Sequence, residues 1–500
     1  MVSLFPGVKH AATVLAQYGT LLNTYNQQHI SIEIQPSVLN TLASLPFVQF
    51  IDWINAPAEP ENLENRTDHR SNNLHTEYGA GRQFDGSGVR IALTDDGLIG
   101  PHIDYQGRTV QSAVIGINNG DHGDHCAGII MGAGNKDPLG RGMAPGSDLW
   151  VYEAVSSNNY ILDDSIYTSP VTSIDIVSTS YSDGCNTGYN AGAESADRQI
   201  NSYKNVMRVF SAGNNGTADC SYGAGAGWGN ITGGIKSAKN LIAVANLDLH
   251  DGLAASSSRG PATDGRLKPD VSAVGTNVYS TIDTDDYDYK SGTSMSCPGV
   301  SGTLAQLYQA YRTLNSGQDP NMGLLKNVVM NTADDLGNPG PDFKFGYGRI
   351  NGLRAVKILE GTQYLTDSVL NGNTRTHTLT VPANTQRVKI MLNWLDKQAA
   401  VGATTALIND LDLKVTDALS VTFLPWVLDP TPVVANLNAN AVRAADHLNN
   451  AEQVTIDNPA AGTYTIEVQG FSVPFGPQTY FISYEFISNN ALEVTYPIGG

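Results

Sequence analysis

Long apolar segments are absent from this sequence of 500 residues, in which no run of about 18 apolar residues occurs. We therefore expect no membrane-spanning helix. Basic residues are also scarce, because 29 Lys and Arg stand against 48 Asp and Glu, and the net charge is -19. This charge disfavours nucleic acid and anionic membranes as partners. The opening residues MVSLFPGVKHAATV lack a basic region followed by an apolar one, so any secretion signal is expected to have been removed or never to have existed.

Cysteine is scarce too, and the four that occur are too few for a disulfide scaffold. Cys126 and Cys297 lie in apolar helical patterns, which favours buried free thiols. Cys185 and Cys220 lie in loops rich in Gly, Asn and Ser, where the cysteines of a secreted protein are more often paired. We therefore predict one disulfide, between Cys185 and Cys220.

The length of the chain allows two or three domains. Residues 1–60 read as a small α+β unit, in which strands at 29–34 and 47–54 flank a helix that starts at Pro36. The polar stretch 61–72 follows and is predicted to be a linker or a processing region.

Two larger domains are predicted after this stretch. From 73 to 358, short apolar strands that end in Gly, Asp or Asn alternate with helical patterns, which is typical of an α/β fold with a parallel sheet. From 359 to 489 helices vanish and turn signals recur, which predicts an all-β jelly roll or sandwich. One face of its strands is expected to carry Val388, Ile390, Leu392 and Trp394, and Tyr464, Ile466 and Val468. Residues 490–500 are expected to begin a linker to a further module.

Four chemically distinct side chains stand where predicted strands end or predicted helices begin: Asp95, His122, Asn214 and Ser294. A serine nucleophile needs an imidazole to take its proton and a carboxylate to orient the imidazole. It also needs donors for the developing oxyanion, which an amide and a helix N-terminus can supply. Each of these residues alone is more often a cap, a turn or polar surface. The four together predict a serine hydrolase.

Four segments, ALTDDG, HGDHCAG, SAGNNG and SGTSMSCPGVSG, resemble in this order the signature segments of the subtilisin-like serine proteases. The order Asp, His, Ser sets that family apart from chymotrypsin-like and α/β-hydrolase enzymes. The segment SSSRGPATDGRLKPDV is a further family feature, and the stretch with NWLDKQAA and LINDLDLKV is similar to the β-barrel of a bacterial branch of secreted alkaline subtilases. The resemblance covers residues 70–488.

The resemblance implies a role for each residue of the catalytic group: Asp95 orients, His122 is the general base and then the acid, Ser294 is the nucleophile, and Asn214 completes the oxyanion hole. Gly292 is expected to allow the tight turn before the nucleophile. Pro298 is expected in the first turn of the following helix, where no N–H is missed.

The segment STSYS, with Ser180, Tyr181 and Ser182, matches the family's substrate-binding strand. A substrate would add to it through main-chain hydrogen bonds that are indifferent to sequence. The implied function is a secreted, extracellular, monomeric serine endopeptidase of broad specificity that acts on proteins and peptides without a catalytic cofactor. For Tyr181 the alternative is a position in an ordinary buried strand. For the whole chain the alternative is a non-catalytic binding or adhesion protein.

Three positions depart from the family pattern: Asp96 and Asp124 replace Ser or Thr, and Gly299 replaces a histidine. Two extra carboxylates close to the imidazole would raise its pKa. We therefore expect activity that rises only at alkaline pH, unless these carboxylates point into solvent.

Metal ions enter as two further hypotheses. His122, His125 and Cys126 could ligate a catalytic metal, which the SGTSM segment and Asn214 disfavour. Structural calcium is plausible at the acidic stretch 283–289. The resemblance also places calcium at three acidic residues of the all-β domain, Asp396, Asp410 and Asp412. A solvated acidic face is the alternative.

The N-terminal unit, residues 1–60, resembles the intramolecular chaperone and inhibitor with which subtilases are commonly made. The chain is then a zymogen, its own prodomain is a partner, and cleavage is expected within NAPAEPENLENRTDHRSNN, residues 55–73. The alternative is a permanent N-terminal domain.

Overall fold

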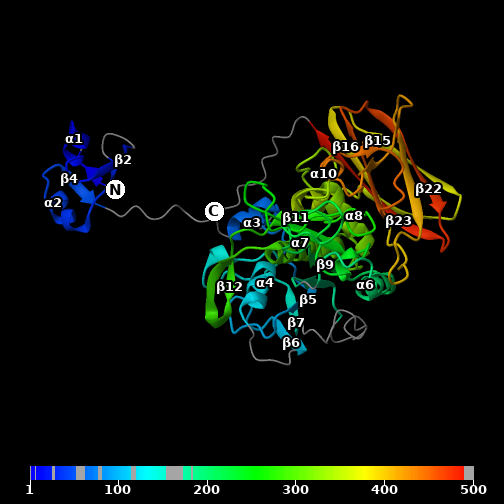
Figure 1. Ribbon diagram of the computed structural model, residues 1–500, viewed down its shortest axis with the longest axis horizontal. Coiled ribbons are helices and arrows are strands. Elements are labelled where there is room, and N and C mark those ends of the chain that lie inside the picture. The colour runs from blue at the N-terminus through cyan, green and yellow to red at the C-terminus, as the bar shows by residue number, and fades with distance from the viewer. Residues whose placement is uncertain are drawn as a thin grey trace. The chain divides into compact units, whose positions relative to one another are not determined.

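The computed structural model describes residues 2–5, 7–24, 29–51, 62–76, 81–113, 120–153, 173–181 and 184–488. They belong to two compact units, residues 1–59 and 60–500 (Figure 1). Within the described ranges no helix combines the length and the apolar character needed to cross a membrane.

The smaller unit is an α+β fold, as predicted. Its antiparallel sheet has the strand order β2-β3-β1-β4. The elements are β1 (Val2–Leu4), α1 (Ala11–Leu15), β2 (Thr20–Thr24), β3 (His29–Glu33), η1 (Pro36–Val38), α2 (Leu39–Ala43) and β4 (Val48–Ile51). Val2, Leu15, Ile30 and Leu42 form the centre of its core. The sequence predicted β3, the helix after Pro36 and β4, but not β1, α1 or β2.

The larger unit contains the predicted parallel sheet. Seven strands lie in the order β11-β10-β9-β8-β5-β7-β6, and all neighbours are parallel. The strands are β5 (Arg90–Asp95), β6 (Thr109–Ala113), β7 (Asp148–Glu153), β8 (Ile176–Thr179), β9 (Met207–Ser211), β10 (Ile242–Leu247) and β11 (Val271–Val274). The strand order reverses beside β5, and ligands of open α/β sheets bind at the carboxyl ends of strands at such a point.

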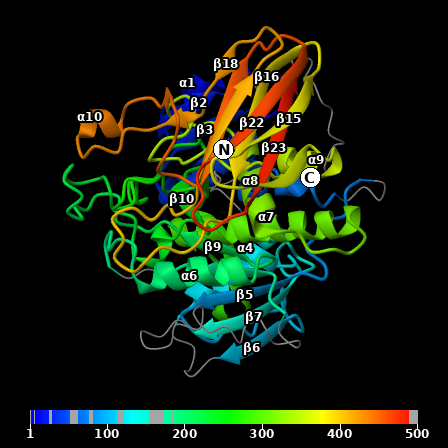
Figure 2. The ribbon, with the colours of Figure 1, turned by 90° about the vertical axis from the view of Figure 1, so that its right-hand side faces the viewer.

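Helices cover this sheet, and one of them, α7 (Thr293–Leu314), is buried along most of its length. Figure 2 shows α7 running between the parallel sheet and the β-rich part of the unit. The other long helices are α4 (His122–Met131), α6 (Ala191–Ser202), α8 (Met322–Thr332) and α9 (Gly352–Glu360). The last of these ends two residues beyond the predicted domain boundary at 358.

The stretch predicted to be a linker is instead largely helical. It forms α3 (Asn62–Asp68) and η2 (Ser71–Asn73). Asn65 is 1% exposed and His69 is fully buried, and both are bonded to the end of β11. The linker prediction is therefore wrong for residues 62–72, because buried polar side chains of this segment are bonded to the backbone of the larger unit. Residues 52–61 lie outside the described residues.

The C-terminal part is the predicted all-β fold. Two antiparallel sheets, β14-β23-β16-β21 and β15-β22-β17-β18, enclose a second core. The main strands are β14 (Tyr364–Val369), β15 (Thr374–Val381), β16 (Thr385–Asn393), β17 (Asp410–Thr416), β18 (Thr422–Phe423), β21 (Ala451–Asp457), β22 (Gly462–Ser472) and β23 (Gln478–Ser488). The smaller elements are β19 (Trp426–Val427), α10 (Val434–Leu437) and β20 (Val442–Arg443). Every side chain predicted to face the core is at most 1% exposed.

The outer face of one sheet of this sandwich packs on α8. Asn327 donates to the backbone carbonyls of Met391 and Phe481, and Asn331 donates to that of Ser483. The sandwich and the parallel sheet therefore form one unit, as Figure 2 shows. Residues 490–500, expected to start a linker, lie outside the described residues.

Candidate active site

Asp95 and His122 form a bonded pair at the carboxyl end of β5. Asp95 is the last residue of the strand and is 2% exposed, and it pairs with Glu153 of the neighbouring strand β7. His122 is the first residue of α4, and its Nδ1 lies 2.5 Å from Asp95 Oδ1. A proton on Nδ1 is thereby shared with the carboxylate, and Nε2 is left as the basic nitrogen.

Ser294 is the second residue of α7 and follows a sharp turn. Gly292 has a φ of 154°, which favours glycine, and its N–H donates to the carbonyl of Gly275. The Ser294 hydroxyl donates to the backbone carbonyl of Ser180, 3.0 Å away. In this structure the hydroxyl proton is therefore directed at Ser180 and not at the imidazole.

Pro298 does not lie in the first turn of its helix, contrary to the prediction. The helix begins at Thr293, so Pro298 is its sixth residue and lacks the N–H that would bond the carbonyl of Ser294. Two outside groups take this place: the Ser180 hydroxyl at 3.0 Å and the Cys126 thiol at 3.4 Å. The carbonyl of Ser294 is thus bonded to the residue that follows β8 and to α4, and not to its own helix.

Asn214 is exposed beside this turn. Its Oδ1 accepts hydrogen bonds from the backbone N–H and the hydroxyl of Thr293, both at 3.0 Å. The side-chain NH2 is therefore the outward end of the amide. A Cβ on Gly292 would lie 3.3 Å from Nδ2, so glycine also leaves the amide its space. The amide and the N–H groups at the start of α7 are donors suited to an oxyanion.

A profile of the subtilase family matches residues 86–348, more than half of the chain, and spans all of these residues. The chain belongs to the subtilase family. A profile of the bacterial pre-peptidase C-terminal domain matches residues 373–470, in the β-sandwich of this subtilase.

Curated relatives agree with this assignment. The chain is 30% identical over 297 residues to the thermophilic serine proteinase of Bacillus sp. (strain AK1). This match covers 57% of this chain and 65% of that relative. It is 27% identical over 285 residues to thermitase of Thermoactinomyces vulgaris and 27% identical over 276 residues to subtilisin DY of Bacillus licheniformis. These matches cover 55% and 54% of this chain and 90% of each relative. The family and the relatives support a serine endopeptidase.

The extra carboxylates of this subtilase have different surroundings. Asp96 receives the N–H of Gly123 at 2.8 Å and that of His122 at 3.2 Å, so it caps the start of α4. Asp124 is fully buried and receives the hydroxyl of Tyr105 and the N–H of Gly100, both at 2.6 Å. Neither carboxylate points into solvent, but only Asp96 is bonded to the histidine residue.

The electrostatic environment favours protonation of His122. The neighbouring Cys126 sulfur and the Asp95 carboxylate both raise the pKa of its imidazole. Burial raises the pKa of the Cys126 thiol to about 12, so the thiol is neutral and Asp95 supplies the stabilising charge. Burial and the adjacent Asp95 also raise the pKa of Asp96, and His122 opposes this rise.

The predicted substrate-binding strand lies beside the nucleophile. Ser180 follows β8, and its main chain and side chain both bond to Ser294. Tyr181 is half-buried and packs against the main core of the subtilase unit. Ser182 lies outside the described residues.

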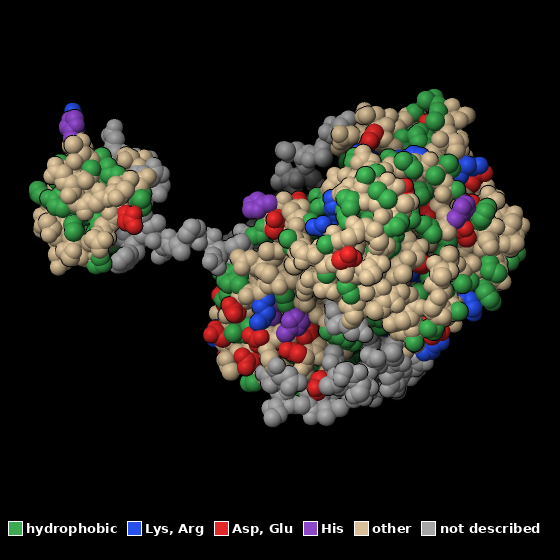
Figure 3. Space-filling view, in the orientation of Figure 1, with side chains coloured by type: hydrophobic (Ala, Val, Ile, Leu, Met, Phe, Trp, Pro, Cys, Tyr) green, Lys and Arg blue, Asp and Glu red, His purple; other side chains and the backbone are tan. Residues whose placement is uncertain are grey.

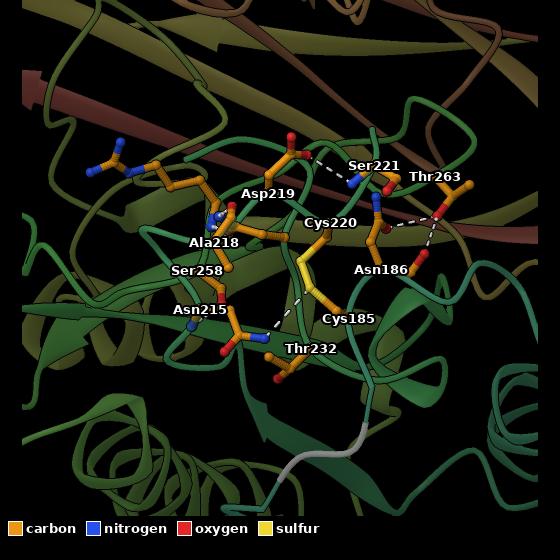
Figure 4. Close-up of a disulfide and its surroundings, with 12 residues drawn as sticks. Cys185, Asn186, Asn215, Ala218, Asp219, Cys220, Ser221, Thr232, Ser258 and Thr263 are labelled. Atoms are coloured by element: carbon orange, nitrogen blue, oxygen red, sulfur yellow. Dashed lines mark hydrogen bonds between the residues drawn. A yellow bond between two sulfur atoms is a disulfide. The ribbon is translucent and has the colours of Figure 1, made fainter. Parts of the chain in front are cut away.

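The predicted disulfide joins Cys185 and Cys220, whose Cα atoms are 5.5 Å apart (Figure 4). It ties the segment after the substrate strand to the loop after Asn214. Asn215 donates to the sulfur of Cys185, as the dashed line in Figure 4 marks. The bridge therefore joins two loops beside the candidate active site. Cys126 and Cys297 are buried free thiols, as predicted.

A catalytic metal site on His122, His125 and Cys126 is not formed. His125 is fully buried and its Nε2 bonds to the carbonyl of Asp288, 3.0 Å away. Among the described residues, two groups have ligand atoms within 4.8 Å of one another: Asp95, His122 and Cys126, and Asp410, Asp412 and His447. The acidic stretch 283–289 is not among them. It forms the hairpin of β12 (Val278–Ile282) and β13 (Asp286–Lys290), where acidic side chains gather on the surface (Figure 3).

The prediction that Asp396 shares a calcium site with Asp410 and Asp412 is wrong. Its carboxylate lies 3.0 Å from the buried Lys239 ammonium and accepts the N–H groups of Ile408 and Asn409. The lysine and the two N–H groups compensate the buried charge of Asp396. Its carboxylate oxygens are therefore already used.

Asp410 and Asp412 themselves lie together near residues that the sequence did not indicate. His447 Nδ1 lies 2.9 Å from Asp410 and 3.6 Å from Asp412. Burial raises the pKa of Asp410 to about 6. Burial and the Asp446 carboxylate raise the pKa of Glu452 well above its usual range. No local sequence pattern marks His447 or Glu452. They approach β17 only in the folded chain, His447 from the loop before β21 and Glu452 from β21 itself.

Proposed function

We propose that this subtilase is a serine endopeptidase that uses Asp95, His122, Ser294 and Asn214. The carboxylate-imidazole pair at 2.5 Å, beside a serine at the start of a buried helix, is the observation that carries the proposal. His122 Nε2 takes the hydroxyl proton as Ser294 Oγ bonds to the substrate carbonyl carbon. The Asn214 amide and the N–H of Ser294 receive the oxyanion. His122 then gives the proton to the leaving amine, and water releases the acyl group by the same steps.

Each of these steps uses groups of the chain itself, so the mechanism needs no catalytic cofactor. Before attack, the Ser294 hydroxyl turns away from the Ser180 carbonyl toward the imidazole. This rotation about one bond frees that carbonyl, and Tyr181 follows it along the same segment. A substrate strand adds there through its main chain, so broad specificity among proteins and peptides follows.

The test is labelling by a serine-directed phosphonofluoridate, followed by mass mapping and by digestion of casein. We expect the label on Ser294, digestion by the wild type, and loss of both in Ser294→Ala. Digestion that stops with a chelator but resists the reagent would instead indicate a metal hydrolase. A wild type that neither cuts casein nor takes the label would favour the non-catalytic binding protein.

Secretion and self-processing belong to the same proposal. The disulfide supports an oxidising compartment, and the α+β unit, residues 1–59, supports a prodomain that is part of a monomeric zymogen. Since α3 and His69 are built into the catalytic unit, we place the cut before Asn62. N-terminal sequencing of the wild type and of Ser294→Ala tests this. A cut that persists in the alanine variant without another protease contradicts self-processing.

A structural calcium ion at Asp410 and Asp412 is the second part of the proposal. Asp410 Oδ1, Asp412 Oδ1 and Glu452 Oε1 are buried and accept no hydrogen bond within the described part of the chain. Such carboxylate oxygens fit a hard cation, which would neutralise the cluster and join β17 to its neighbours.

The melting temperature in calcium and in a calcium chelator tests this site. We expect calcium to raise it, and Asp412→Asn to remove the rise. Asp286→Asn, an exposed acid of the β12–β13 hairpin, is the control that should keep it. Loss of the rise in Asp286→Asn alone would move the site to the hairpin, and no rise in the wild type would refute it.

A further inference from the structure

Gly299 lies on α7, five residues after the proposed nucleophile. The side chain of His69, from another segment of the chain, fills the space next to it. A Cβ at this position would lie 2.7 Å from Cε1 and 3.1 Å from Nδ1 of His69. Five residues of helix span about 7.5 Å. The ring of His69 therefore packs on the nucleophile helix within two turns of Ser294, where the family pattern has a histidine on the helix itself.

The same imidazole also holds the end of β11. His69 Nε2 accepts the N–H of Val274 at 2.8 Å, and Asn65 Nδ2 donates to the carbonyl of Val274 at 3.3 Å. Burial and the charges of Arg349 and Arg70 lower the pKa of His69 to about 3, so the ring is neutral and its proton is on Nδ1.

Val274 is next in the sequence to a residue that is hydrogen-bonded to the turn before Ser294. The next residue, Gly275, accepts the N–H of Gly292 at 2.8 Å. A Cβ on Gly275 would lie 2.7 Å from the N of Ser296, so β11 and the start of α7 are in direct contact. Two routes thus run from His69 toward Ser294: one through Val274 and the Gly292 turn, and one through Gly299 and the helix.

We infer that His69 is a positioning residue for Ser294, and that the segment of residues 62–73 acts as a clamp on the nucleophile turn. This inference rests on the proposed endopeptidase function. The clamp is fastened at further points, since the carbonyl of His69 accepts the N–H of Gly352 and that of Ser71 accepts the side chain of Gln306. None of the contacts just described joins the clamp directly to Asp95, to Asn214 or to the proposed substrate strand. Loss of the ring should therefore lower kcat more than it raises KM.

The measurement is kcat per active site, with sites counted by a serine-directed titrant. In His69→Ala we expect kcat to fall about tenfold or more, with KM changed less than about twofold, since small displacements of a nucleophile have large effects on rate. His69→Gln keeps an acceptor near Nε2 and should recover most of the rate. Ile466→Ala in the sandwich core is the control, because it lowers stability without touching α7.

A second variant tests the packing even if His69→Ala fails to fold. Gly299→Ala alone places its Cβ against the ring and should lower kcat, whereas in a His69→Gln background the more flexible side chain should relieve the loss. Unchanged kcat per titrated site in His69→Ala, or equal losses from Gly299→Ala in both backgrounds, overturns the inference.

Failure of the endopeptidase proposal can be told apart from failure of the clamp. Hydrogen exchange at the amide of Gly292 needs no catalysis, and it should be about tenfold faster in His69→Ala than in Ile466→Ala. A wild type without protease activity but with this difference refutes the function and keeps the clamp. Equal exchange in the two variants refutes the clamp.

Discussion

The carbonyl group of Ser294, the proposed nucleophile, is bonded outside its own helix. Pro298 cannot donate to it, and the hydroxyl of Ser180 and the thiol of Cys126 do so instead. The segment after β8 and the helices α4 and α7 therefore meet at one oxygen atom. These bonds hold the backbone of Ser294 in place without involving its hydroxyl group.

Ser180→Ala tests the role of this bond at the scale of a single residue. The variant loses one donor to a buried carbonyl, which should cost about 1–3 kcal/mol of stability and lower kcat. KM should change little, because substrate pairs with the main chain of this strand. Steady-state kinetics and thermal melting measure both effects. Ser301→Ala removes a hydroxyl elsewhere on α7 and should retain kcat; equal kcat in the two variants would contradict the role.

The pH dependence of activity separates the two extra carboxylates. His122 must lose its proton to act as a base, so a raised pKa moves the acidic limb of kcat/KM to higher pH. Asp96 stabilises the protonated ring, and Asp96→Asn should move this limb to lower pH by about 0.5–1 unit. The amide oxygen still caps α4.

Asp124→Asn is the matched control for this measurement. Asp124 is bonded to Tyr105 and Gly100 and not to the histidine residue. Its substitution should leave the acidic limb in place. An unmoved limb in Asp96→Asn, or a shift of the same size in both variants, would refute the assignment of the raised acidic limb to Asp96.

At the scale of elements, the sequence predicted the strands that carry the chemistry, because buried parallel strands leave a strong apolar pattern. The strands that end near Asp95, Ser180 and Asn214 are β5, β8 and β9, as expected. The helix α3 was not predicted, since its buried polar residues Asn65 and His69 look like a solvated linker. Their partners are backbone groups of β11, more than 200 residues away, and no local pattern reveals them.

The alternation of apolar and polar residues in the sandwich strands predicted the core-facing side correctly. It did not reveal that the opposite side of β16 is also buried. Val388, Ile390 and Leu392 face the core, as expected. Lys389, on the opposite face of β16, is only 5% exposed and donates to the carbonyl of Ala333. A lysine that is buried and hydrogen-bonded at an interface cannot be told in the sequence from a lysine in water. The alternation of polar and apolar residues therefore does not distinguish the two faces.

At the scale of elements, the disulfide joins two loops beside the proposed active site. It closes a loop with a sequence separation of 35, for which chain entropy gives at most about 4 kcal/mol. Replacing Cys185 and Cys220 by Ser should lower the melting temperature and, through the loop after Asn214, kcat. Differential scanning calorimetry and kinetics measure these effects. Cys297→Ser, at a buried free thiol on α7, is the comparison, and equal kinetics in the two variants would separate the bridge from the active site.

At the scale of the whole molecule, the sandwich is tied to the parallel sheet by a buried charge cluster. Lys239 lies 3.0 Å from Asp396 of the sandwich and 3.6 Å from Asp197 of α6, and all three side chains are fully buried. Its ammonium also donates to the carbonyls of Lys397 and Ala406. One cation thus serves two carboxylates and two carbonyls across the interface.

Lys239→Met should leave two buried carboxylates without their counter-charge and lower stability by about 3–5 kcal/mol. Because the loss comes from uncompensated charge, adding Asp396→Asn should restore part of it, although the double variant has fewer polar contacts than the wild type. Thermal unfolding of the two variants and of Asp396→Asn alone measures the coupling. Additive losses in the double variant would mean that Lys239 acts through packing, and that the many neutral bonds between α8 and the sandwich hold the two parts together without it.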